Sequence, residues 1–507
     1  MEPAPPLLAP LTRACHDPVF SCSPPTLALG VAVALSFFSL GGCRPPVLSA
    51  QDSDSGLRNC DAADLDADAD GQDEIDGDCD DCDPRVRLGP EALDGVDQPC
   101  AGTGGVDHAR ADDFDGTVVL SETATGYGTS LASDGTVLAV GSPAGNRVDL
   151  YPLDVAGPAT AADFSPGGTS CQIGAALAFG TVTGDEFHDL LIGGPLCGDG
   201  AGEVTLITAS HYADPNDGAL RVDGAGAGLF GASVSVADRL VAVGAPLEGL
   251  GGSFFVVEGS VLAAGGLNIS DFVPYPSATA AAGLGGALGT GAWSGTGAKD
   301  LAVGAPGDGT IAGEVWLYND LDALLGGAAT PNQALTGGPR FGMTLTSGAL
   351  SDQGTDSLIV AEYAGDPEAA EVTLHVFHPE QLDGAATAEA ATCRIEGLAA
   401  GAWVAQSGGT VLFAGAQLGI GVGDASGDGA ADLLLGSPGS GDAWLLLHES
   451  LASCAGVVDL PTVAAARLEG EGIGTGAVIG DAIGGSPADL VLGDPREAQV
   501  LVIPSQY

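Results

Sequence analysis

The sequence predicts an all-β protein: a seven-bladed β-propeller of four-stranded antiparallel blades, preceded by a small acidic, cysteine-rich, metal-binding module. Three observations support this prediction. A bulky residue followed by Gly recurs seven times, and each copy leads through a turn into an apolar strand that usually ends in Gly-X-Pro. Successive copies begin about fifty to seventy-five residues apart. That spacing is the length of one four-stranded sheet with its loops and is typical of a repeat architecture.

Seven residue pairs open the repeats: Tyr127-Gly128, Ile173-Gly174, Phe230-Gly231, Leu284-Gly285, Phe341-Gly342, Leu418-Gly419 and Ile473-Gly474. A strand such as VAVGAP at 241–246 has no polar alternation, so it needs apolar cover on both faces, as an inner strand between stacked sheets has. Its Gly allows a close backbone approach, and its Pro removes a ladder donor where pairing stops. The fifth copy, SLIVAEY at 357–363, lacks Gly-Ala-Pro.

These residues resemble FG-GAP repeats, the blades of the integrin α-chain propeller and of many bacterial surface proteins. The resemblance covers roughly residues 113–507 and implies a propeller domain over 109–507. The blades implied by the repeat pairs span about 126–172, 173–229, 230–283, 284–340, 341–417, 418–472 and 473–507.

The last repeat predicts how the ring closes. After Gly493-Asp494-Pro495 only one strand remains, AQVLVIP at 498–504, so the last sheet lacks its outer strand. The segment GTVVLSE at 116–122 has the required alternation, and we expect residues 113–120 to complete that blade. The interval 393–417 is overlong, and we interpret SGGTVLFAGAQ within it as an inserted hairpin; a ring of eight units is the alternative.

The N-terminus is typical of a targeting segment. Residues 26–40 are apolar but too few to span a bilayer comfortably, and they end in Leu40-Gly41-Gly42-Cys43. This tetrapeptide resembles a bacterial lipobox, which implies a lipoprotein signal peptide over 1–42, lipidation of Cys43 and a tether over 43–59. The expected location is the bacterial cell envelope, at the outer membrane or cell surface. An ordinary secretory signal is the alternative, and the true start codon stays open.

Cysteine usage agrees with export. Eight cysteines follow Cys43, in two even groups: Cys60, Cys79, Cys82 and Cys100 before the repeats, and Cys171, Cys197, Cys393 and Cys454 within them. Even numbers in an exported chain predict disulfides. Cys171 and Cys197 flank the motif of the second blade and are predicted to pair. Cys79 and Cys82 have the spacing of a zinc or redox pair, but the surrounding carboxylates favour a disulfide.

The sixth repeat carries the strongest metal motif. Asp424, Ser426, Asp428 and Asp432 place side-chain oxygens at positions one, three, five and nine, and Ala430 offers its carbonyl at position seven. Hard cations such as Ca²⁺ prefer six to eight oxygen ligands. The motif resembles the calcium loop of integrin-type blades, with a solvated Asp/Gly-rich turn as the alternative. The corresponding loops of the second, fourth and seventh repeats keep fewer oxygens, and we expect their terminal Asp to serve as a turn cap.

A second acidic motif lies in the predicted module over 60–108. It spaces its oxygens by two before a Gly, as EF-hand-like and thrombospondin type 3 loops do: Asp66, Asp68, Asp70, Gln72 and Glu74. The following segment, 76–100, resembles a metal-binding motif of bacterial surface proteins, although Leu93 stands where that family has Cys. Carboxylates without clustered His or Met favour calcium over copper. An acidic disordered tether is the alternative.

The formal net charge of −53 comes from 67 acidic and 14 basic residues. Such a surface repels nucleic acid and attracts cations, so no nucleic-acid partner is expected. A GC-rich genome or a saline habitat would produce the same bias.

The sequence gives little support to an enzyme. No GxSxG, HExxH, P-loop or Rossmann motif occurs in a convincing context. His375 and His378 lie three apart on a predicted strand and therefore on opposite faces. We therefore expect a lipid-anchored, calcium-binding propeller that binds a surface protein or glycan. A polysaccharide hydrolase or lyase, favoured by acids with His or Arg at the ring centre, and a passive envelope scaffold are the alternatives.

Overall fold

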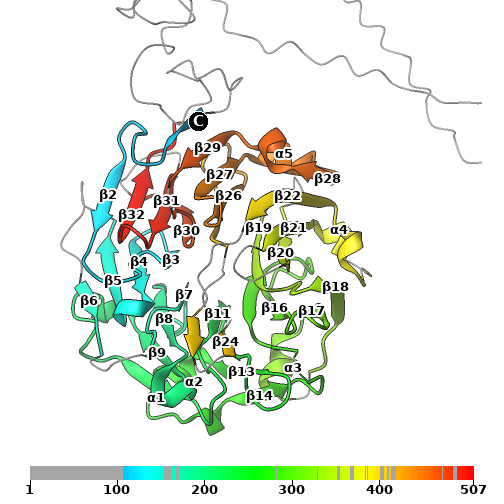
Figure 1. Ribbon diagram of the computed structural model, residues 1–507. Coiled ribbons are helices and arrows are strands. Elements are labelled where there is room, and N and C mark those ends of the chain that lie inside the picture. Colours follow the sequence, from blue (N-terminus) through cyan, green and yellow to red (C-terminus); the bar gives the residue numbers. More distant parts are fainter. Residues whose placement is uncertain are drawn as a thin grey trace, which may run out of the picture. The chain divides into compact units, whose positions relative to one another are not determined.

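The computed structural model describes residues 107–506 except 154–161, 167–170, 281, 328, 351–353, 366–369, 383, 385, 400–404, 408–409, 413–417, 471 and 483–487. All described residues belong to one compact unit, Arg58–Tyr507. Seven sheets follow one another around a common centre in chain order (Figure 1). The protein is therefore a seven-bladed β-propeller, as the repeats predict.

Blades 1 to 4 are four-stranded, antiparallel and ordered from the centre outwards as in the chain. Blade 1 is β3 (Ser130–Ser133), β4 (Val137–Ser142), β5 (Arg147–Pro152) and β6 (Ala162–Phe164). Blade 2 is β7 (Ala176–Gly180), β8 (Asp189–Gly194), β9 (Glu203–Ile207) and β10 (Leu220–Asp223). Blade 3 is β11 (Ser233–Ala237), β12 (Leu240–Ala245), β13 (Ser253–Glu258) and β14 (Val273–Pro276). Blade 4 is β15 (Ala287–Gly291), β16 (Asp300–Ala305), β17 (Ala312–Tyr318) and β18 (Gln333–Pro339).

Blades 5 and 6 each carry a fifth outer strand that runs parallel to its neighbour. Blade 5 is β19 (Thr344–Gly348), β20 (Ser357–Ala364), β21 (Glu371–Phe377) and β22 (Cys393–Ala399), extended by β28 (Gly456–Asp459). Blade 6 is β25 (Ile420–Gly423), β26 (Asp432–Ser437), β27 (Asp442–Leu446) and β29 (Ala466–Glu469), extended by β1 (Asp107–Arg110). The prediction of four strands per blade missed these two additions.

Blade 7 closes the ring with both ends of the domain. It contains β30 (Ala477–Gly480), β31 (Asp489–Asp494), β32 (Gln499–Ile503) and the N-terminal β2 (Val118–Ser121). β2 pairs antiparallel with β32, with Val118 opposite Val502 and Leu120 opposite Val500, and Figure 1 shows the two strands side by side. The predicted closing strand is confirmed, although it spans 118–121 rather than 113–120, so blade 7 leaves β2 rather than β32 at its outer edge.

Short helices complete the domain: α1 (Cys197–Gly200), α2 (Gly259–Ala263), α3 (Leu321–Leu325), α4 (Pro379–Leu382), α5 (His448–Ala452) and α6 (Leu460–Val463). No helix of the described residues is long and apolar enough to cross a membrane. In the sequence between blades 5 and 6, β23 (Ala405–Ser407) and β24 (Thr410–Leu412) pair as a two-stranded antiparallel hairpin. This is the predicted insertion, and it adds no eighth blade.

Among the described residues, the apolar core forms seven clusters, one between each pair of neighbouring blades. In β4, Val137 and Ala139 pack towards blade 2, whereas Leu138 and Val140 pack towards blade 7. Side chains of a strand alternate between the two faces of its sheet. A sheet covered on both faces therefore needs an uninterrupted apolar run, which explains why the repeats lack polar alternation.

Two disulfides lie within the described part of the propeller. Cys171–Cys197 lies in blade 2, as predicted. Cys393–Cys454 joins the start of β22 in blade 5 to the segment after α5 in blade 6.

Candidate functional site

The candidate metal loop of blade 6 connects β25 to β26. Asp424 accepts hydrogen bonds from the N–H of Gly427 at 2.7 Å and from the N–H of Gly429 at 2.9 Å. Asp428 accepts one from the N–H of Ala430 at 2.7 Å. Gly429 adopts φ = +87°, a left-handed conformation that favours glycine. The loop is thus a chain of tight turns held by its own carboxylates.

Asp432 ends this loop and is fully buried at the start of the inner strand β26. Its carboxylate accepts hydrogen bonds from the N–H groups of Ala425 and Ser426, both at 2.8 Å, and from that of His448 at 2.7 Å. Burial raises the pKa of Asp432, and the hydrogen bonds from His448 and Ser426 oppose that rise. Asp432 therefore holds both the loop and the beginning of α5 against its strand.

Three sister blades use the same arrangement. Asp189, Asp300 and Asp489 are buried at the start of their inner strands. Each accepts a hydrogen bond at 2.7 Å from a backbone N–H of the preceding loop: Thr183 for Asp189, Ser294 for Asp300 and Ala482 for Asp489. The expectation that the terminal Asp caps its turn is confirmed.

The carboxylates of the blade 6 loop do not converge on one point. Within the part of the chain that the structure describes, no group of three or more His, Cys, Asp or Glu side chains could hold a metal ion. The donor types nevertheless suit Ca²⁺, since all are oxygens, and the Ser426 hydroxyl lies 3.5 Å from a carboxylate oxygen of Asp424. Metal binding would therefore require Asp424 and Asp428 to exchange some of their backbone hydrogen bonds for the ion.

The same loop contacts blade 7. The N–H of Ala488, just before β31, donates to the carbonyl of Asp424 at 3.2 Å. The hydroxyl of Ser505, just after β32, donates to the carbonyl of Ala425 at 2.6 Å and is buried. The conformation of this loop is thus linked to the blade that closes the ring.

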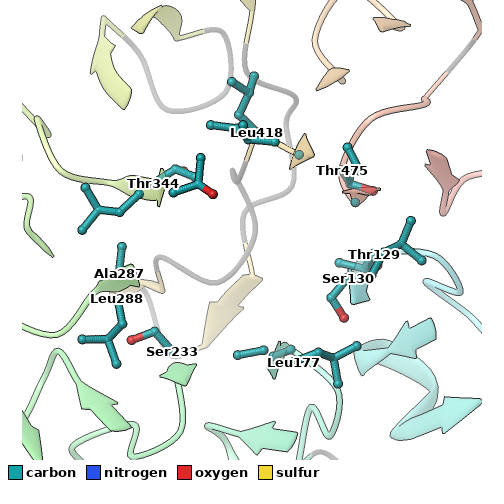
Figure 2. Close-up of a pocket in the computed structure, with 18 of the residues that line it drawn as sticks. Thr129, Ser130, Leu177, Ser233, Ala287, Leu288, Thr344, Leu418 and Thr475 are labelled. Atoms are coloured by element: carbon teal, nitrogen blue, oxygen red, sulfur yellow. The ribbon is translucent and has the colours of Figure 1, made fainter. Parts of the chain in front are cut away.

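A central pocket of about 200 Å³ lies where the first strands of all seven blades meet. Figure 2 shows lining residues from around the ring, among them Thr129, Leu177, Ser233 and Thr475. The residues described as lining it are all Ala, Gly, Ile, Leu, Met, Ser, Thr or Val. Its volume is below the roughly 300–1,000 Å³ typical of sites for drug-sized ligands.

Several hydroxyl groups of this lining are already engaged between blades. Ser233 of blade 3 donates to the carbonyl of Gly285 in blade 4 at 2.9 Å, and Ser130 of blade 1 donates to that of Gly174 in blade 2. These bonds leave fewer polar groups free for a ligand at the ring centre.

The histidines of blade 5 have separate partners, as their spacing predicts. His375 Nε2 lies 3.3 Å from Glu362 Oε2, and its proximity holds the pKa of Glu362 below its usual range. His378 Nδ1 lies 2.7 Å from the Ser357 hydroxyl, and burial lowers the pKa of His378. Trp293 and Trp444 are buried in the apolar clusters between blades.

Several predicted site residues lie outside the described residues. They are the lipidation site Cys43, the cysteines Cys60, Cys79, Cys82 and Cys100, and the acidic motif Asp66, Asp68, Asp70, Gln72 and Glu74. Sequence reasoning, in turn, missed the contacts of Ala488 and Ser505 with the blade 6 loop. A terminal Ser and a loop Ala carry no signal in sequence, because both contacts depend on the ring being closed.

No family model matches the chain, and no curated protein matches it. Solved structures with a similar fold include "Kuenenia stuttgartiensis Hydrazine Synthase", at 10% identity and a TM-score of 0.46, covering 76% of this chain and 97% of that chain. Another is the WD40 domain from Toxoplasma gondii coronin, at 10% identity and a TM-score of 0.45, covering 77% of this chain and 87% of that chain. These likenesses concern the fold alone.

Proposed function

We propose that this protein is a lipid-anchored, calcium-binding propeller that binds a protein or glycan at the bacterial cell surface through its rim loops. The observation that carries the proposal is the exposure of large apolar side chains on those loops. Phe187, between β7 and β8, is 66% exposed, and Leu250, between β12 and β13, is 79% exposed. Variable loops on a rigid ring are a natural binding platform, and each of these exposed side chains offers apolar area that a partner could bury.

The ring centre supports a binding role over a hydrolase or lyase. General acid–base chemistry needs a titratable group within reach of the substrate, and none of the described residues lining the central pocket is titratable. A rim function also agrees with the small volume of that pocket.

The proposed calcium would occupy the blade 6 loop, held by the side chains of Asp424, Ser426, Asp428 and Asp432 and the carbonyl of Ala430. The ion would neutralise these carboxylates and would stiffen a loop whose carbonyls contact Ala488 and Ser505 of blade 7. The acidic module over 60–108 is proposed as a second calcium-binding region, and Cys43 as the lipid anchor.

A binding screen tests the rim function. The full chain, with and without calcium, would be applied to arrays of bacterial surface glycans and extracellular protein domains. The loop between the first and second strands of a blade and the loop between its second and third strands lie at opposite ends of those strands. Phe187→Ser and Leu250→Ser therefore alter opposite faces of the ring. We expect one variant to lose about tenfold in affinity and the other to bind as the parent does. Binding that both variants leave intact, or no binding by the parent, contradicts the proposal.

The calcium assignment has its own matched pair of variants. Asp428 and Asp185 both stand four residues before the terminal Asp of their loops, and both are exposed. Each accepts one hydrogen bond from the N–H two residues later. Bound ion stabilises the native state with the logarithm of its concentration. Asp428→Ala should abolish the calcium-dependent rise in melting temperature, and Asp185→Ala should keep it. Equal responses to calcium in both variants would show that the loop is an ordinary acidic turn.

The anchor is tested separately. Cys43→Ser should move the protein from the membrane fraction to the soluble fraction and remove an incorporated acyl label. An unlabelled parent protein would contradict the lipid anchor without affecting the rim proposal.

A further inference from the structure

Most neighbouring blades meet through a pair of glycines. The inner-strand Gly of one blade faces the carbonyl of the opening Gly of the next blade, so closely that a Cβ on the former would overlap that oxygen. The pairs are Gly141 with Gly174, Gly193 with Gly231, Gly244 with Gly285, Gly304 with Gly342, Gly436 with Gly474 and Gly493 with Gly128. The second glycine of each pair has a φ between +85° and +93°. Six of the seven interfaces between blades therefore share one backbone contact.

The interface between blades 5 and 6 lacks this contact. Blade 5 has Ala361 where the other inner strands have Gly, and its Cβ takes up the space through which the next blade approaches. Gly419, which opens blade 6, is absent from the left-handed glycines. Its N–H donates at 2.8 Å to the carbonyl of Gly474 in blade 7, whereas the opening Gly285 donates within its own blade, to Gly304 at 2.9 Å.

Side chains replace the missing glycine contact. Tyr363, at the position of the Pro in Gly-Ala-Pro, is buried, and its hydroxyl accepts a hydrogen bond from the N–H of Leu418 in blade 6 at 2.9 Å. The Thr344 hydroxyl lies 2.9 Å from the same Tyr363 oxygen. Further out, the Ser437 hydroxyl of blade 6 accepts a hydrogen bond from the N–H of Ala399 in blade 5 at 2.9 Å.

A covalent cross-link spans the same interface. Cys393 of β22 is bonded to Cys454, which follows α5 of blade 6, and β28 then pairs parallel with β22 from Cys393 opposite Gly456 to Glu396 opposite Asp459. Cys393 is fully buried and Cys454 is 8% exposed. By contrast, Cys171–Cys197 closes a loop of 26 residues within blade 2. Of the two described disulfides, only Cys393–Cys454 bonds a strand of one blade to a segment that follows a strand of the next.

We propose that the blade 5–6 interface is the place where the ring opens, and that Cys393–Cys454 is a redox-sensitive cross-link that keeps it closed. A dithiol reductant would transfer two electrons and two protons to the disulfide, so that the Cys393–Cys454 S–S bond breaks to give two thiols while the reductant forms its own cyclic S–S bond. The reduced protein would then depend on Tyr363, Ser437 and β28 at this interface. This inference is independent of the proposed rim binding.

Hydrogen exchange of the full chain tests where the ring opens. Because a cross-link restrains local opening, the double variant Cys393→Ser/Cys454→Ser should exchange the amide hydrogens of Leu418 and Gly439, which both donate to blade 5, about tenfold faster or more. The amides of Phe230 and Leu284, which donate across the blade 2–3 and blade 3–4 interfaces to the carbonyls of Ala201 and Gly251, should keep their parent rates. The matched double variant Cys171→Ser/Cys197→Ser should leave Leu418 to Gly439 unchanged. Equal acceleration at all interfaces, or unchanged exchange at blades 5 and 6, would overturn the proposal.

Reduction kinetics of the parent and of Tyr363→Phe provide a test that needs no cysteine variant. Dithiothreitol reaches the buried bond only when the interface opens, and alkylation followed by mass spectrometry reports each disulfide separately. Losing the hydroxyl leaves the Leu418 N–H without its acceptor. Tyr363→Phe should therefore speed reduction of Cys393–Cys454 by roughly tenfold and leave Cys171–Cys197 unchanged. Equal rates for Cys393–Cys454 in the two proteins would show that this interface does not control access to the bond.

Discussion

Gly493 in the last blade lies against the carbonyl group of Gly128 in the first, so that a Cβ on Gly493 would overlap the carbonyl oxygen. These residues are far apart in the sequence and meet only when the ring is closed. Gly128 has φ = +85°, which suits glycine. The contact repeats, across the closing interface, the glycine pairing that joins blades in the middle of the chain.

Substituting Gly493 with Ala should destabilise the protein by more than about 4 kcal/mol, because a backbone oxygen cannot move aside as a flexible side chain does. Gly480, at the end of β30 in the same blade, provides the control. A Cβ there would have its nearest neighbour at 3.7 Å, so Gly480→Ala should change stability by less than about 1 kcal/mol. Denaturant unfolding of the two variants checks this difference, and similar losses would contradict the close approach.

The closing strand offers a second test. Leu120 is buried against the cluster between blades 7 and 1, whereas its neighbour Val119 is 41% exposed. Leu120→Asp would bury an unpaired charge and should cost about 3 kcal/mol or more. Val119→Asp should cost less than about 1 kcal/mol, since its side chain faces solvent. If both variants have the same melting temperature as the parent protein, β2 does not hold the ring closed.

Much of this fold could be predicted because its signals are periodic. The apolar run of β16 follows because both faces of its sheet are covered by neighbouring blades. The alternation of β2 follows because its side chains are alternately buried and exposed. The outer strands β1 and β28 could not be predicted in the same way. The DHAR sequence of β1 has no apolar pattern, and its strand conformation results from backbone pairing with β29. The outer strand β28 lies beside β22 where Cys454 is bonded to Cys393, a pairing that spans 61 residues.

The site was predictable to a lesser degree. Spacing identified Asp424, Asp428 and Asp432 as candidate ligands and the terminal aspartates as turn caps. It could not show that three backbone N–H groups donate to Asp432, because one of them belongs to His448, which follows β27 and lies 16 residues away in the sequence. Tyr363 did carry a signal, since it stands where other repeats have Pro. Its role as a hydrogen-bond acceptor could not be predicted, because that role depends on where Leu418 of the next blade lies.

Asp432 should matter to stability even without calcium. Asp432→Ala leaves the N–H groups of Ala425, Ser426 and His448 without their acceptor, and each unsatisfied buried donor costs about 1–3 kcal/mol. We expect a total loss of more than about 3 kcal/mol in EDTA. Asp428→Ala removes one exposed hydrogen bond and should cost less than about 1 kcal/mol under the same conditions. Comparable losses would mean that the cap does not hold the loop.

Asp149 in β5 predicts a pH dependence. It is fully buried and accepts a hydrogen bond from Arg147 Nε at 2.7 Å, while its other oxygen has no hydrogen-bond partner among the described residues. Burial raises the pKa of Asp149 from 3.8 to about 6, against the opposing effect of Arg147. The folded state therefore holds this proton more tightly than the unfolded state. The resulting stabilisation is fully present below the unfolded pKa and is lost as pH rises through the folded pKa.

Asp149→Asn removes this titration, since the amide stays neutral. The stability of the variant relative to the parent should rise between pH 4 and pH 7 by roughly 2 kcal/mol and then level off. Exposed Asp217 in blade 2 provides the control, and Asp217→Asn should give a difference that is flat over the same range. Urea unfolding at half-unit pH intervals measures both curves. A flat difference for Asp149→Asn would mean that Arg147 keeps this carboxylate ionised throughout, and a falling one would mean that the charge pair outweighs the effect of burial.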